Sequence, residues 1–207
     1  MYVARAIHGW PVKFVARCWS VHDWRLHGCD TQGLDASDAS WAIMAMEAGG
    51  FVAGISCGFI SDVLFRGDRA AVIASSAVGL YWSLLAFVSR VQVPGAALLL
   101  EGWVSPEAAS VVVSCFFVGL TAFPIHVLVG LAAREIVPLH VAGTAGSLVK
   151  AMGQVGSFLA GYTMAKVVEA SGWPPVETMS ILAPCAMAVL MIPVWRARTS
   201  LPKDKRS

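Results

Sequence analysis

The chain has 207 residues, of which 57% are hydrophobic and only 14% are charged. An average soluble domain carries roughly 25% charged and 45–50% apolar residues, so this composition excludes a water-exposed globular protein. The net charge of +2 is too small to indicate a nucleic-acid partner, and the charges lie in short clusters between apolar blocks. We therefore expect an integral membrane protein of the all-α class.

The first 38 residues are the least regular part of the sequence. Arg5, Lys13 and Arg17 interrupt the apolar residues here, so no signal peptide is indicated. Each of these basic residues would cost roughly 2.5–3.5 kcal/mol in a spanning helix, and the segment should not insert alone. It could enter as a helix whose arginines face a polar cavity. We treat residues 1–38 as an atypical first helix and loop.

Five apolar blocks follow, each long enough to cross a membrane. A spanning helix needs roughly 20 mostly apolar residues to cross about 30 Å of hydrocarbon. A basic tail over residues 196–207 comes after the last block. Within a helical bundle of residues 39–195, the predicted spans are 39–60, 70–89, 108–133, 141–165 and 178–195.

The connections on one side of this predicted bundle are far more basic than those on the other. Arg66, Arg69, Arg134 and the tail bring eight basic residues to one side, against two on the opposite side. The positive-inside rule then predicts a cytosolic C-terminus. It does not distinguish the endoplasmic reticulum, the plasma membrane or another organelle.

The sequence offers no motif for catalysis, for a cofactor or for a metal. The five cysteines are scattered without metal-ligand spacing, and His22, His27 and Cys29 match no standard site. A nucleophile motif, a phosphate-binding loop and a dinucleotide fingerprint are also absent from the sequence. We therefore expect a protein that is not an enzyme.

Small and polar residues form one stripe along the predicted span 141–165. Their spacings of three and four place them on one face of a helix. Lys150 lies in this stripe, where a charge inside a membrane needs a counter-charge, a water-filled cavity or an anionic ligand. It is either a substrate-contacting lysine, the partner of Glu47, or a neutral buried amine. The stripe consists of Gly143, Ser147, Lys150, Gln154, Ser157 and Gly161.

Two other polar residues lie within predicted spans. Glu47 precedes three glycines, Gly50, Gly54 and Gly58, whose spacing allows a neighbouring helix to approach closely. Glu47 serves either gating or ion pairing, or is solvated at the helix end. His126 lies close to Pro124, where a locally broken helix can present a polar ring to a cavity. The alternative is a histidine of the protein core whose ring nitrogens have hydrogen-bond partners.

The loop after the first span combines acidic and basic residues. Asp62, at the end of one helix, can pair with Arg66 or Arg69 in the turn. Such a charge latch can hold helices in one conformation and release them in another. The alternative is the ordinary basic charge of a cytosolic loop.

With these motifs, the sequence resembles the organophosphate:phosphate antiporters of the major facilitator superfamily. The resemblance covers residues 39–195 and is to the C-terminal half of the family, a bundle of six helices, of which five are clear here. It is carried by the segments Glu47–Phe51, Gly58–Asp62, Leu64–Arg69, Gly130–Glu135, Pro138, Ala142–Ala145, Gly153–Gly156, Leu159–Gly161 and Gly172–Trp173.

The resemblance also implies a substrate site. The family's seventh helix has a phosphate-binding arginine shortly before an Asp-Trp pair, and here Arg17 precedes Asp23 and Trp24 with one extra residue between them. Arg5 before Trp10 imitates the pattern with one residue fewer, but lies too far upstream. Arg17, His126 and Lys150 are thus the expected substrate contacts, and Asp62, Arg66, Arg69 and Glu47 the expected gating residues.

The function implied by this resemblance is exchange of a sugar phosphate, such as glucose 6-phosphate, or another organophosphate for inorganic phosphate. The chain would need an N-terminal half-transporter or a second copy of itself, besides the lipid bilayer. Two alternatives stay open: a membrane sugar-phosphate sensor of the same family, and a truncated fragment without activity.

Overall fold

The computed structural model describes residues 29, 31, 33–65, 68–135 and 137–199. Two predicted site residues, Arg17 and Arg66, lie outside this described part of the chain, as do residues 1–28 and 200–207. Every regular element in the described part is a helix, which confirms the all-α class. The helices are α4 (Ala36–Val63), α5 (Arg69–Val88), α6 (Ala96–Leu99), α7 (Pro106–Glu135), α8 (Leu139–Ser171) and α9 (Pro174–Thr199).

Polar side chains and a glycine define where the long helices begin and end. Asp68 caps α5 by accepting hydrogen bonds from the backbone N–H groups of Ala70 (3.1 Å) and Ala71 (3.4 Å). The Ser105 hydroxyl accepts one from the N–H of Ala108 at the start of α7 (3.3 Å). These bonds satisfy N–H groups that have no partner inside the helix. Gly172, with φ of 75°, ends α8 in a conformation that glycine adopts readily.

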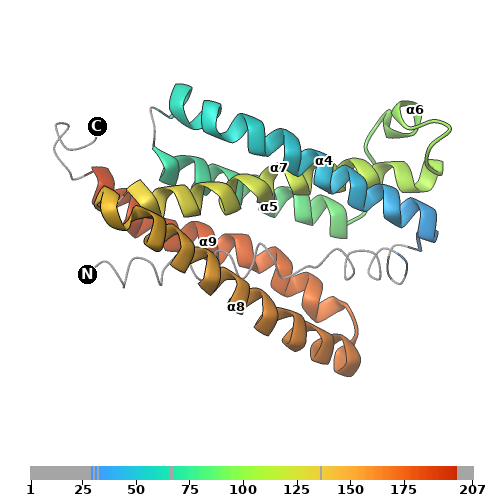
Figure 1. The fold of residues 1–207 in the computed structure, drawn as a ribbon. Helices are drawn as coiled ribbons and strands as arrows, with labels where there is room; N and C mark the ends of the chain where they lie inside the picture. The colour runs from blue at the N-terminus through green and yellow to red at the C-terminus, as the bar shows by residue number, and fades with distance from the viewer. Residues whose placement is uncertain (1–28, 30, 32, 66–67, 136, 200–207) are drawn as a thin grey trace.

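Helix α7 is the centre of the bundle. It packs most extensively against α4 and α5, and it also contacts α6 and α8, while α9 packs against α5 and α8. Figure 1 shows α7 between α4 on one side and the α8–α9 pair on the other. The most deeply buried side chains include Cys115, Ile125 and Leu128 of α7 and Met187 of α9. The core therefore follows α7 along its length.

Helices α4 and α7 approach each other until their backbones touch. A Cβ atom on Gly49 would overlap the carbonyl oxygen of Phe116, and one on Gly119 would overlap that of Met46. Among the three glycines predicted for close packing, Gly50 and Gly54 face the ring of Phe123, whereas a Cβ on Gly58 would meet open space. The predicted mode of packing is present, but the backbone contact is made by Gly49, one residue before the predicted series.

Three helices in the described part are long and apolar enough to cross a membrane: α4, α5 and residues Pro106–Ala132 of α7. Among the described residues this count is three, against five predicted for the chain, and α8 and α9 occupy the two remaining predicted stretches. Helix α8 carries Lys150, Lys166 and Glu169 among many small polar residues, which lowers its apolar character. Its membrane position must depend on its neighbours more than on its own hydropathy.

The predicted loop over residues 166–177 is mostly helical. Helix α8 continues to Ser171 and α9 begins at Pro174, so only two residues, Gly172 and Trp173, connect them. Figure 1 shows the α4–α5 turn, the α7–α8 turn and the end of α9 at one end of the bundle. The opposite end holds the α5–α7 connection with α6. We call these the basic end and the α6 end.

Candidate functional site

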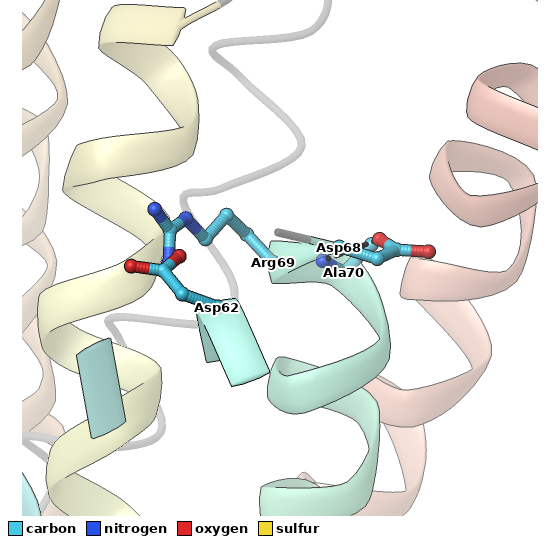
Figure 2. A network of polar contacts seen from close by, with 4 residues as sticks. All are labelled: Asp62, Asp68, Arg69 and Ala70. Carbon is cyan, nitrogen blue, oxygen red and sulfur yellow. Dashed lines mark hydrogen bonds and ion pairs between the residues drawn. The ribbon is translucent and has the colours of Figure 1, made fainter. Parts of the chain in front are cut away.

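An ion pair connects α4 and α5 at the basic end. Arg69 Nη1 lies 2.8 Å from Asp62 Oδ1. Figure 2 shows the Arg69 side chain reaching from the first turn of α5 back to Asp62 on the last turn of α4. The Arg69 side chain is 13% exposed and that of Asp62 is 62% exposed. A covered guanidinium therefore meets a carboxylate that remains accessible to water.

The neighbouring acidic residue, Asp68, caps a helix. Asp68 points away from the ion pair, towards the N–H groups of α5 that it caps, as Figure 2 shows. Of the two arginines predicted as partners of Asp62, Arg69 makes the contact, and Arg66 lies outside the described residues. The described residues of the turn therefore include an interhelical ion pair and a helix cap.

Helix α8 presents its polar stripe away from the described helices. Gly143, Ser147, Lys150 and Gln154 are exposed, while Ser157 and Gly161 lie where side-chain placement is not described. The adjoining face is small: Gly146, Gly153 and Gly156 are buried together with Val149. The side chain of Arg134, in the last turn of α7, lies over Gly146. The bundle thus covers the glycine face and leaves the Lys150 face open.

Lys150 is exposed, which argues against a neutral buried amine. Glu47 is also exposed, on α4, and within the described ranges neither residue forms an ion pair. The structure therefore does not bring Lys150 and Glu47 together. Lys150 stands 11 residues after Leu139, about 17 Å along the helix. An open lysine at this depth suits an anionic ligand or a second bundle better than an internal pair.

His126 lies on α7, two residues after Pro124, which stands inside the helix. Pro124 and Ile125 are buried and His126 is half-buried. Because proline has no N–H, it removes one backbone hydrogen bond of the helix. The preceding ring, Phe123, packs over Gly50 and Gly54 of α4. His126 and Lys150 thus lie on two helices that pack against each other.

At the α6 end, sequence reasoning missed a side-chain hydrogen bond that connects α4 with the residue before α7. The Ser105 hydroxyl donates to Asp38 Oδ2 at 2.6 Å, and the Ser110 hydroxyl donates to Gln92 Oε1 at 3.2 Å. These residues border a polar groove of about 630 Å³ between α4, α5 and α7, together with Arg90 and others. The sequence signals only the helix start, because Ser105 stands directly before Pro106 and Glu107, and no pattern pairs Ser105 with Asp38.

The described residues contain no group of three or more His, Cys, Asp or Glu side chains placed to hold a metal ion. The bundle has long apolar helices with exposed apolar side chains along them, and Asp62, Arg69 and Arg134 lie at helix ends. This arrangement defines a multi-pass integral membrane protein.

Comparison with known proteins shows what this chain is similar to. The chain is 30% identical over 183 residues to the membrane sensor protein UhpC of Escherichia coli (strain K12), a match to 87% of this chain and 38% of UhpC. It is 26% identical over 189 residues to a probable hexose phosphate transport protein of Chlamydia pneumoniae, covering 90% of this chain and 38% of that protein. No family model and no solved structure matches.

A third relative is the glycerol-3-phosphate transporter of Bacillus subtilis (strain 168), 25% identical over 178 residues, covering 84% of this chain and 36% of the transporter. The chain spans less than two fifths of the length of these relatives. The predicted resemblance is confirmed: over most of its own length the chain is similar to organophosphate transporters and to a membrane sensor protein, and its extent is consistent with the C-terminal half of such a protein.

Proposed function

We propose that the chain acts as the C-terminal half of a sugar-phosphate transporter that exchanges an organophosphate for inorganic phosphate. The observation that carries this proposal is the similarity of most of this chain to part of a probable hexose phosphate transport protein and to part of a membrane sensor protein. Transporters of this architecture move substrate by rocking two bundles around a site near the middle of the membrane.

The substrate would bind on the open face of α8. Lys150 would attract the phosphate group through a charge-assisted hydrogen bond, which is stronger than a bond between neutral groups. Its exposure and its surroundings of glycine and serine leave room for a ligand. In this proposal Arg17 supplies the principal phosphate contact and His126 a polar contact to the sugar.

The Asp62–Arg69 ion pair would serve as the latch at the basic end, with Arg66 as a further basic residue of the turn and Glu47 acting further along α4. The ion pair joins consecutive helices, so it holds the ends of α4 and α5 together while it is intact. The exposed carboxylate of Asp62 is accessible to a competing basic group from a second bundle. Exchange of partners at Asp62 would then accompany the change between conformations.

A second bundle is required to close a transport pathway. In this proposal it is an N-terminal half-transporter or a second copy of the chain, and the basic end faces the cytosol. The open Lys150 face of α8 would meet this second bundle.

Two measurements on the purified chain test the proposal. Binding of radiolabelled glucose 6-phosphate is measured in nanodiscs, with inorganic phosphate as competitor. Flux is measured in proteoliposomes loaded with labelled phosphate, by its release on addition of external sugar phosphate. The liposomes contain the chain alone or the chain co-reconstituted with the N-terminal half of the Chlamydia pneumoniae relative. Binding together with flux in either preparation supports the proposal, and absence of both contradicts it.

A sensor function is the second candidate, because a relative that shares 30% identity is described as a membrane sensor protein. A sensor must bind the sugar phosphate but need not move it. Saturable binding without flux in both preparations would therefore favour sensing. An inactive fragment would show neither.

A further inference from the structure

The connection between α5 and α7 is an ordered segment with one buried side. Ala96, in the short helix α6, is 1% exposed, and Leu100 and Val104 pack against the bundle core. Backbone hydrogen bonds from Leu99 to Gly95 (3.1 Å) and from Leu100 to Ala96 (3.2 Å) close its turns. The segment is therefore held against the α6 end of the bundle.

The opposite side of this segment is apolar and faces outwards. Leu98 is 79% exposed, Leu99 is 80% exposed and Trp103 is 66% exposed. The Trp103 ring is fixed by an edge-on contact with Trp41 of α4, with ring centroids 5.3 Å apart. An ordered turn that buries its small residue and displays two leucines and a tryptophan is unfavourable in water, because the displayed apolar area stays hydrated.

The length of α5 sets the depth of this segment. Its 20 residues extend about 30 Å, which matches the hydrocarbon thickness of a bilayer. Ser89, its C-cap, therefore lies close to the membrane boundary, and the following residues lie at headgroup depth. Figure 1 places α6 beside the beginning of α7, at the end of the bundle. Tryptophan is enriched at this depth, where its ring is amphipathic.

From these observations we propose that residues 91–104 form an interfacial anchor that inserts Leu98, Leu99 and Trp103 into the lipid of the leaflet at the α6 end. Lipid is the occupant favoured here because the patch adjoins the exposed apolar surface of α4, a helix apolar enough to cross a membrane: Trp103 contacts Trp41, and Met44, about one turn further along α4, is 53% exposed. The neighbouring exposed side chains Arg90 and Glu101 suit the headgroup region.

Single cysteines labelled with an environment-sensitive fluorophore test this proposal. Leu98→Cys and Leu99→Cys are made in a background whose native cysteines are replaced by alanine, with Glu101→Cys as the matched control from the same segment. Each labelled protein is reconstituted in liposomes and quenched either by iodide in water or by lipids that carry spin labels at shallow depth. We expect positions 98 and 99 to be quenched several-fold less by iodide, and several-fold more by lipid, than position 101.

Two results would overturn the anchor. Equal iodide quenching at 98, 99 and 101 would place the segment in water. Protection of 98 and 99 from both iodide and lipid quenchers would show that protein, such as a second copy, covers the patch. If the cysteine-free background does not fold, the chain with its native cysteines is placed in brominated lipid. There Trp103→Phe should remove part of the lipid-dependent tryptophan quenching, and an unchanged quenched fraction would also contradict the proposal.

Discussion

Asp62 and Arg69 form an ion pair of 2.8 Å between the end of α4 and the start of α5, in which the arginine is largely covered and the aspartate is open to water. Because the two side chains differ in exposure, removing one should cost a different amount of stability from removing the other. Removing Asp62 takes a carboxylate from a covered cation, whereas removing Arg69 leaves a carboxylate that water can solvate.

The first prediction follows from this asymmetry. Asp62→Asn should lower the stability of the purified protein by about 1 kcal/mol, and Arg69→Gln should lower it less. The double variant should show a coupling between the two sites, measured by thermal unfolding in detergent. Asp68→Asn is the control, because asparagine still caps α5 while the loop charge changes as in Asp62→Asn. Additive effects of the two variants would show that the pair has no energetic role.

The second prediction concerns the contact between α4 and α7. Gly49→Ala and Gly119→Ala should each destabilise the bundle by about 1–3 kcal/mol or prevent its assembly, because the added methyl group overlaps a backbone carbonyl that cannot move aside. Gly58→Ala, on the same helix but facing open space, should be nearly neutral. Size-exclusion profiles and unfolding midpoints in detergent provide the measurement. A neutral Gly49→Ala would contradict the close approach.

The third prediction assigns the open face of α8 to the substrate. Lys150→Ala should weaken sugar-phosphate binding roughly 10- to 100-fold, the equivalent of a charge-assisted hydrogen bond of about 1.5–3 kcal/mol. Lys166→Ala is the matched control, since Lys166 is an exposed lysine on the same helix whose Nζ pairs with Glu169 Oε2 at 3.0 Å. Equal affinities for the two variants would remove Lys150 from the site.

The fourth prediction concerns the Ser105–Asp38 hydrogen bond at the α6 end. Ser105→Ala removes both the helix cap of α7 and the 2.6 Å bond to Asp38, so it should lower stability by about 1 kcal/mol. Asp38→Ala should cost less, because the cap remains. Ser40→Ala is the control, as its hydroxyl bonds only within α4 in the described contacts. Hydrogen exchange at Ala108 and Ala109 would report loosening of the first turn of α7, and unchanged exchange in Ser105→Ala would contradict the assignment.

Apolar composition predicted a helical membrane protein because each spanning backbone must satisfy its own hydrogen bonds, a constraint that needs no knowledge of partners. The Asp62–Arg69 pair was also predictable, since both residues lie at the two ends of one short turn. The contact of Gly49 with Phe116 was not, because a glycine series identifies a close-packing face but does not give the register between two distant helices. The same reason kept Asp38 and Ser105, 67 positions apart, from being paired in advance.

The placement of Lys150 shows the other limit of sequence reasoning. Periodicity grouped it with Gly143 and Ser147 on one face, but which face the bundle covers depends on packing with α7. The covered face is the one that adjoins Lys150, where Gly146, Gly153 and Gly156 are buried and Gly146 lies under the Arg134 side chain. Arg17 and Arg66 lie outside the described residues, so their roles remain predictions.

The two-residue connection between α8 and α9 has a consequence for biosynthesis. Helix α8 carries Lys150 within its length, and only Gly172–Trp173 separate it from α9, so α8 cannot stay on one side of the membrane while α9 inserts separately. During translation the pair should therefore leave the translocation channel together as a helical hairpin. Helix α7 is synthesised before this pair, and α8 would then pack against it with Gly146 under the Arg134 side chain.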